Sequence, residues 1–145
     1  MSRYISDDLR HLVASRADYL CEYCLIHEDV TFFGCQVDHI ISLKHGGSTE
    51  SNNLAYACTF CNRRKGSDIA SIEAETGNLV GLYNPRVDKW ADHFRLNGKI
   101  LEPLTGIGEA TARILGFNSA DRILEREALI SAGHYPTTEA LIRMQ

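Results

Sequence analysis

The sequence lacks any apolar run approaching the roughly 20 residues that a membrane-spanning helix needs. Its first eight residues also lack the basic-then-apolar order of a secretory signal peptide. No internal repeat and no low-complexity tract interrupts the 145 residues, of which 44% are hydrophobic and 23% are charged, as in ordinary globular proteins. We therefore expect a cytoplasmic protein of ordinary globular composition, without a membrane segment.

The sequence also lacks the excess of positive charge that marks many nucleic-acid-binding proteins. The net charge is −4, and acidic and basic residues are spread evenly over the chain. Any surface that binds a polyanion must then be a local patch rather than a whole face. Bound cations would change this balance, because their charge is absent from the count.

A disulfide framework is absent as well, because the number of cysteines is odd and a cytoplasmic chain is kept reduced. Four of the five cysteines form two CxxC pairs, Cys21 with Cys24 and Cys58 with Cys61. Two such pairs predict one tetrahedral Cys₄ zinc site, which is structural because no position is left for water. Redox-active pairs are the alternative interpretation of the same spacing. Cys35 is left over and is expected to be a buried small hydrophobe.

The first half of the chain predicts a helix followed by a strand–loop–strand–helix unit. Ser6 is a plausible N-cap, with acidic residues in the first turn. β-branched and aromatic residues favour a strand before a polar, glycine-containing loop, and Gly66 follows a basic helical turn. The expected elements are a helix over 6–20, strand-rich residues 30–41, a loop over 42–53, a short strand over 54–57 and a helix over 58–65.

The second half is predicted to be a mixed extension. Residues 67–82 have linker-like composition, with a short helix expected near 69–75. Asn97-Gly98 between two apolar triplets indicates a β-hairpin, and residues 108–117 and 119–131 have the spacing of amphipathic helices. We expect residues 1–68 to be the core and residues 69–145 an extension packed on or beside it, in one compact unit.

The stretch Val37–Ile41 carries Asp38 and His39 side by side within a β-branched run. Neighbouring side chains of a strand point to opposite faces, so these two would diverge. A function that uses both requires a strand end or a bent loop. Burying them without partners would be costly, so the sequence must supply partners for them.

At this point the residues resemble a known family. Val37–Ile41, His45-Gly46-Gly47, Asn53-Leu54-Ala55 and Ala57–Gly66 occur in the order found in HNH endonucleases of the ββα-metal class. The resemblance is to the subtype with two CxxC knuckles, with Asn in place of the last His. It covers about residues 10–68, and residues 83–131 resemble the extension of stand-alone bacterial HNH proteins. The implied fold is α+β: a ββα-metal (His-Me finger) core clamped by zinc.

The resemblance also implies roles. His39 would be the general base that activates water, a task suited to imidazole near neutral pH. Asp38 and Asn62 would hold one Mg²⁺ or Mn²⁺, which prefer oxygen ligands. Asn53 would hold His39 in orientation through the loop backbone. The basic residues expected to contact phosphates are Arg63, Arg64, Lys65 and Lys44.

The sequence therefore predicts a metal-dependent endonuclease acting on DNA, with RNA left open as a substrate. The alternative is a catalytically silent Cys₄ zinc module that only binds nucleic acid or protein. We expect no membrane partner. Strandedness, sequence specificity, oligomeric state and biological role do not follow from the residues.

Overall fold

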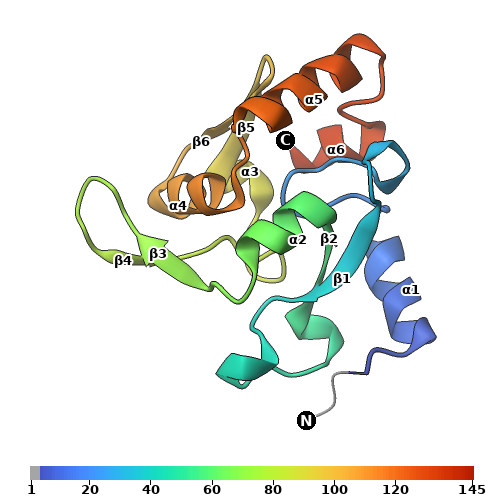
Figure 1. Cartoon of the computed structure of the whole chain (residues 1–145), viewed down its shortest axis with the longest axis vertical. Helices are drawn as coiled ribbons and strands as arrows, with labels where there is room; N and C mark the ends of the chain where they lie inside the picture. The colour runs from blue at the N-terminus through green and yellow to red at the C-terminus, as the bar shows by residue number, and fades with distance from the viewer. Residues whose placement is uncertain (1–3) are drawn as a thin grey trace.

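A computed structural model describes residues 4–145 of the chain (Figure 1). The strands form three separate antiparallel pairs, β1 with β2, β3 with β4 and β5 with β6. The elements are α1 (Asp7–Arg16), β1 (Cys35–His39), β2 (Leu54–Cys58), α2 (Thr59–Lys65), β3 (Ala70–Ile72), β4 (Leu79–Gly81), α3 (Trp90–His93), β5 (Phe94–Asn97), β6 (Ile100–Pro103), α4 (Gly106–Leu115), α5 (Ala120–Ser131) and α6 (Thr138–Arg143). The predicted mixed α+β class is confirmed.

The centre of the molecule is the ββα unit formed by β1, β2 and α2 (Figure 1). β1 and β2 pair with Cys35 opposite Cys58 and with His39 opposite Leu54. The Cys58 side chain accepts from the Cys61 amide at the start of α2, and Gly66, at φ +52°, ends the helix. The strand–loop–strand–helix order predicted from the sequence is therefore present.

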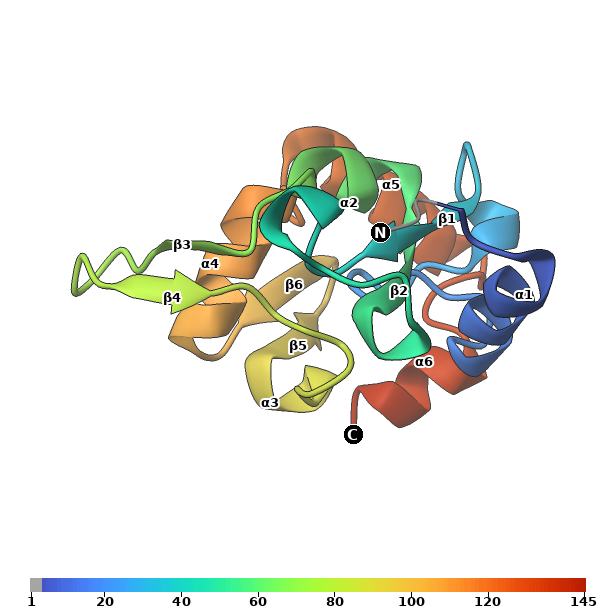
Figure 2. The same cartoon turned by 90° about the horizontal axis from the view of Figure 1, so that it is seen from below.

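Helix α1 covers one side of this unit (Figure 2). Ser6 caps it as predicted, because its side chain accepts a hydrogen bond from the Leu9 amide. Its apolar residues pack with those of β2 in a small cluster. That cluster contains Ile5, Val13, Ala14, Ala17, Leu54 and Tyr56.

The prediction of a short helix near residues 69–75 is wrong. This segment forms β3, which pairs with β4, and the hairpin projects from the body (Figures 1 and 2). Gly77 lies at φ +72°, and the Glu73 amide donates to the Asn78 carbonyl, so the chain reverses before a helix can be completed. Pairing with β4, the second strand of the same hairpin, decided the local structure over the helical spacing.

The predicted hairpin at Asn97 is present, shifted by one residue. Asn97 pairs with Ile100, so the turn consists of Gly98 and Lys99. Gly98, at φ +62°, supplies the left-handed conformation that such a tight turn requires. The two helices expected after it are α4 and α5.

The large hydrophobic core is shared by both halves of the chain. It joins residues around the cysteine pairs with side chains of the second half. Trp90 Nε1 donates to the Tyr23 carbonyl at 2.8 Å, and the Tyr135 hydroxyl donates to the Cys24 carbonyl at 2.9 Å. The boundary at residue 68 stays a prediction. The segment after Gly133, which carries no clear pattern in the sequence, contributes α6 and Tyr135.

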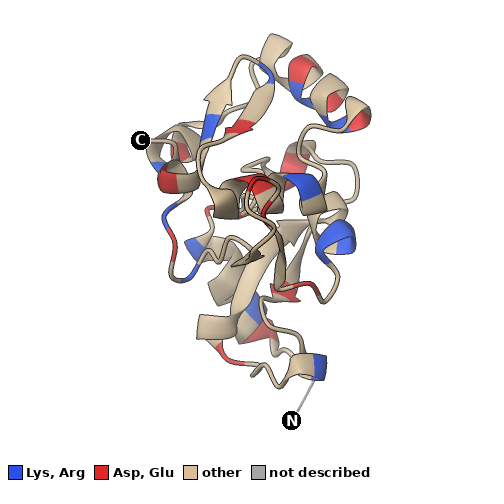
Figure 3. Ribbon diagram, turned by 90° about the vertical axis from the view of Figure 1, so that its left-hand side faces the viewer, with Lys and Arg blue, Asp and Glu red and all other residues tan. Residues whose placement is uncertain are grey.

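Charged residues are interspersed over the molecule. Figure 3 shows Lys and Arg, and likewise Asp and Glu, spread over the ribbon, with neither sign confined to one part of the chain in this view. Among residues 4–145, no helix is both long and apolar enough to cross a membrane. The even distribution of charge expected from the sequence is therefore visible along the fold.

Candidate active site and metal centre

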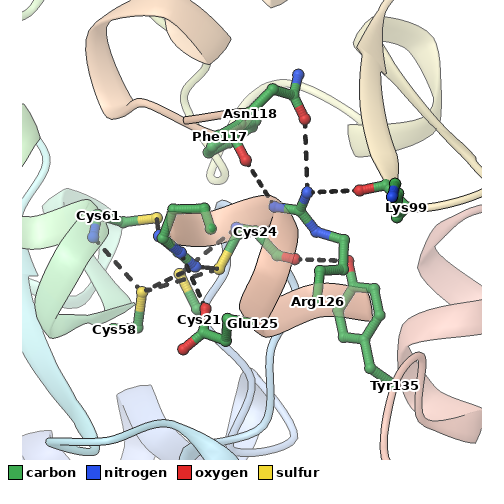
Figure 4. Close-up of polar contacts among 11 residues, drawn as sticks. Cys21, Cys24, Cys58, Cys61, Lys99, Phe117, Asn118, Glu125, Arg126 and Tyr135 are labelled. Carbon is green, nitrogen blue, oxygen red and sulfur yellow. Dashed lines mark hydrogen bonds and ion pairs between the residues drawn. The ribbon is translucent and has the colours of Figure 1, made fainter. Parts of the chain in front are cut away.

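The two CxxC pairs meet in the interior. Cys21 and Cys24 lie in the turn after α1, while Cys58 and Cys61 flank the start of α2 (Figure 4). All four side chains are buried, and their sulfur atoms lie within 4.8 Å of one another. Cys24 Sγ and Cys58 Sγ are 3.8 Å apart. A tetrahedral zinc ion with bonds of about 2.3 Å requires sulfur atoms about 3.8 Å apart.

The chemistry of this donor set fits Zn²⁺. Burial and the neighbouring thiols raise the pKa of the Cys21 thiol. Burial also opposes ionisation of Cys24, but hydrogen bonds from the other three thiols and the charge of Arg122 lower its pKa. Four buried sulfurs cannot all become thiolates unless a cation offsets their charge. The cluster is thus compatible with a structural zinc ion.

Asp38 and His39 line one cleft at the end of β1, although they are neighbours in a strand. The cleft has a volume of about 290 Å³, and it is also lined by Ser42, Leu43, Lys44 and Ser67. β1 ends at His39, where the chain turns away from the strand direction. The strand end expected from the sequence therefore lets the acid and the histidine face the same space.

The His39 ring has a partner that the sequence did not reveal. His39 Nε2 lies 3.0 Å from Thr49 Oγ1, and both side chains are partly buried. Thr49 belongs to the loop between β1 and β2, so the loop itself fixes the ring against the end of the strand. No pattern in the sequence distinguishes Thr49 from the other polar loop residues.

Asn53 connects this loop to the residues that follow His39. Its Oδ1 accepts from the Ile41 amide at 2.9 Å, and its Nδ2 donates to the carbonyls of Ile41 and Ser48 at 2.9 and 2.8 Å. The Asn53 carbonyl accepts from the Ile40 amide at 2.9 Å. Asn53 is 8% exposed. Hydrogen bonds to the loop backbone of the kind expected for Asn53 are present, and its role in catalysis stays a prediction.

Gly47 is closely packed within the loop. A Cβ atom at this position would lie 1.8 Å from the Ile41 carbonyl oxygen and 2.8 Å from Asn53 Nδ2. Backbone cannot yield to such a contact as a flexible side chain can. The loop therefore requires glycine here in order to keep the Asn53 hydrogen bonds.

We expect Gly47→Ala to lower the free energy of unfolding by about 3 kcal/mol, at the upper end of the cost of overpacking. It should also displace Asn53 and thus the end of β1. Thermal denaturation measures the first effect. Gly46→Asn is the matched control, because nothing lies within 4 Å of a Cβ there and Asn tolerates the φ of +84°. Equal stability of both variants would contradict the packing described here.

The expectation that Lys65 contacts phosphate from the surface is wrong. Its side chain is only 3% exposed, so it does not join Arg63 and Arg64 in an accessible basic surface. Lys65 Nζ lies 3.1 Å from Asp38 Oδ2, as an ion pair, and donates to the His39 carbonyl at 3.2 Å. Because α2 runs back along β1, its last residue returns to the end of the strand. Lys65 is thus a partner of the candidate site, not a surface contact for phosphate.

The Asp38 carboxylate has an oxygen atom that could bind a divalent cation. Oδ2 is buried and has no hydrogen bond of good geometry, although the Lys65 ammonium is close enough for an ion pair. Burial raises the pKa of the Asp38 carboxyl, and Lys65 opposes that change. A buried carboxylate oxygen of this kind is a suitable donor for a hard divalent cation.

The remaining predicted residues lie on or near α2. Asn62 does not line the cleft of Asp38 and His39, and its Nδ2 donates to Gln36 Oε1 at 3.0 Å. Gln36 and Asp38 are two positions apart in β1 and so share a face of the strand. Arg63 and Arg64 are exposed, and Lys44 is exposed at the rim of the cleft.

A buried ion pair behind the site was also not foreseen. Glu22, between the first two cysteines, pairs with Arg86 and accepts from the Tyr56 amide at 2.9 Å. Arg86 donates to the Leu54 carbonyl at 3.2 Å. The pair fixes segment 84–88 against β2. No pattern in the sequence indicates that Arg86 pairs with Glu22.

Two sequence comparisons relate this chain to known proteins. The HNH endonuclease family model matches residues 21–68. The Septu protein PtuB of Bacillus thuringiensis is 26% identical over 126 residues, which cover 86% of this chain and 46% of that protein. The chain thus spans about half the length of this curated relative. No solved structure gave a significant match.

Proposed function

We propose that residues 21–68, which form an HNH endonuclease domain, hydrolyse phosphodiester bonds of DNA with the help of a divalent cation. The observation that carries the proposal is the cleft lined by both Asp38 and His39. It lies at the end of a strand whose continuation is fixed by Asn53. An acid and a base that face one cavity suit metal-assisted hydrolysis.

In this proposal the four cysteines hold a structural zinc ion and take no part in the reaction. Four protein ligands leave no site for water. The ion joins the turn after α1 to the start of α2, and therefore brackets the β1–β2 pair that carries Asp38 and His39.

His39 accepts the proton of the attacking water in this mechanism. A general base requires a fixed orientation, and Thr49 together with the Asn53-bound backbone supplies it. Asp38 and Asn62 provide oxygen ligands for Mg²⁺ or Mn²⁺. When bound, such a cation stabilises charge on the phosphate and on the departing oxygen.

Substrate binding in this proposal is electrostatic and local. Lys44 stands at the rim of the cleft, and Arg63 and Arg64 are exposed on α2. Contacts of this kind neutralise backbone phosphates without reading sequence.

The proposal is tested by nicking of supercoiled plasmid by the purified chain with Mg²⁺ or Mn²⁺ and with EDTA. We expect cleavage that depends on the added cation. Binding of DNA without cleavage under every metal condition would favour a silent zinc module instead. One zinc ion bound per chain by all four CxxC thiols would exclude a redox protein that uses these pairs.

Asn62→Ala is expected to raise the Mg²⁺ concentration needed for half-maximal cleavage by about 10-fold, because one oxygen ligand is lost. The measurement is the cleavage rate as a function of Mg²⁺ concentration. Asn52→Ala, at an exposed position of the β1–β2 loop, is the matched control and should leave the curve unchanged. An Asn62→Ala variant with the wild-type metal dependence would remove Asn62 from the proposed site.

A further inference from the structure

Arg122 of α5 lies among the four cysteines. Its side chain is 4% exposed. Arg122 Nη2 is 3.1 Å from Cys24 Sγ and 3.9 Å from Cys58 Sγ, and Nη1 is 3.8 Å from Cys61 Sγ. One guanidinium therefore contacts three of the four sulfur atoms. Arg122 is 61 to 98 residues away from these three cysteines in the sequence.

The other contacts of Arg122 do not account for its burial. Glu125, one turn along α5, is 24% exposed and accepts from Arg122 Nε at 3.0 Å. The guanidinium carbon also lies 5.1 Å from the centre of the Phe60 ring. A buried cation requires a buried counter-charge, and the sulfur cluster is the group that can provide it.

The positive charge of Arg122 complements the charge that the four cysteines would carry around zinc. Four thiolates around Zn²⁺ carry a net charge of −2 in a buried place. One guanidinium halves that charge, and its N–H groups donate to sulfur lone pairs. Arg is suited to this position because its planar fork reaches several acceptors at once, which an ammonium group does not.

We propose that Arg122 is an outer-sphere partner of the zinc site and that it makes docking of α5 and retention of zinc mutually dependent. This inference rests on the structural zinc ion of the proposed function. The linkage is reciprocal: if docked α5 strengthens zinc binding, bound zinc strengthens docking of α5 by the same factor. The zinc ion then connects the HNH domain to the second half of the chain, in addition to clamping the ββα unit.

Arg126 gives a matched control on the same helix. It is also 4% exposed, and it lies one turn beyond Arg122. Its guanidinium donates to the Phe117 and Lys99 carbonyls at 2.7 and 2.8 Å, away from the sulfur atoms (Figure 4). Its replacement should remove these hydrogen bonds within the second half and no hydrogen bond to a sulfur atom.

The test compares the full-length wild type with Arg122→Met, Arg122→Lys and Arg126→Met. Zinc content is measured first, followed by the rate of zinc transfer to the chelator 4-(2-pyridylazo)resorcinol from folded protein. We expect about 10-fold faster transfer from Arg122→Met, in the range for loss of outer-sphere partners, and an intermediate rate from Arg122→Lys. Arg126→Met should transfer zinc at the wild-type rate when compared at an equal folded fraction.

A spectroscopic measurement separates this role from general packing. In Co²⁺-substituted protein, N–H donation to sulfur raises the energy of the thiolate-to-metal charge-transfer band. We expect a shift to lower energy in both Arg122 variants and none in Arg126→Met. Arg122→Lys serves as the informative variant if Arg122→Met fails to fold.

The outcomes are distinct. The inference would be overturned if an Arg122 variant that binds zinc released it at the wild-type rate and its Co²⁺ form showed an unshifted charge-transfer band. The proposed zinc site would not be affected by that result. Wild-type protein without bound metal would overturn the zinc site, and with it the inference. Faster release confined to the Arg122 variants, with a shifted band, supports the coupling.

Discussion

His39→Ala should lower the rate of plasmid cleavage by about 10²–10⁴-fold, the usual contribution of a general base. The loss should fall on the chemical step, because the proposed cation ligands and the exposed arginines stay in place. The zinc content and the thermal unfolding temperature should change little, because the ring is only partly buried against Thr49. Single-turnover cleavage with saturating Mg²⁺ measures the effect.

His45→Ala is the matched control for this variant. His45 lies in the same loop but is exposed, and it does not line the cleft with His39. We expect its cleavage rate to stay within about twofold of the wild type, as surface substitutions have small effects. A cleavage rate of His39→Ala equal to that of His45→Ala would show that His39 is not the base.

Cys61→Ser should prevent the HNH domain from folding. Binding of structural zinc contributes about 10–16 kcal/mol in small zinc domains, as much as or more than the total stability of about 5–15 kcal/mol of an ordinary domain. Cys61 also occupies the first turn of α2, and its sulfur lies near Arg122. Loss of bound zinc and loss of the cooperative thermal transition are the expected results.

Cys35→Ser is the control for this experiment. Cys35 lies in β1, opposite Cys58, but it is outside the sulfur cluster and only partly buried. Its replacement should keep the zinc content and shift the unfolding temperature by a few degrees at most. Normal folding of Cys61→Ser in the presence of EDTA would contradict a structural role of the cluster.

Local chemistry made the ββα unit predictable. Ser6 as a cap, Gly66 as a helix end and the β-branched run before His39 each act over a few residues, so the sequence displays them directly. The gathering of the CxxC pairs was predictable for another reason, because few structures other than a metal site bring together four cysteines that form no disulfide.

Contacts between distant residues were not predictable. Lys65 was expected on the surface because it follows two arginines, and only the path of α2 back to the end of β1 places it beside Asp38. Arg122 lies in an amphipathic pattern whose polar residues are normally solvated. The β3–β4 hairpin that replaces the helix expected near 69–75 also contacts a distant element, because Arg113 of α4 donates to the Ile72 carbonyl at 2.6 Å. Tertiary partners decided each of these positions.

The most direct test is anomalous diffraction from crystals grown with Mn²⁺, measured at the zinc and manganese edges. A zinc peak is expected among Cys21, Cys24, Cys58 and Cys61, and a separate manganese peak beside the Asp38 carboxylate and the Asn62 amide oxygen. Zinc at both positions, or no manganese near Asp38, would contradict a division between one structural and one catalytic metal.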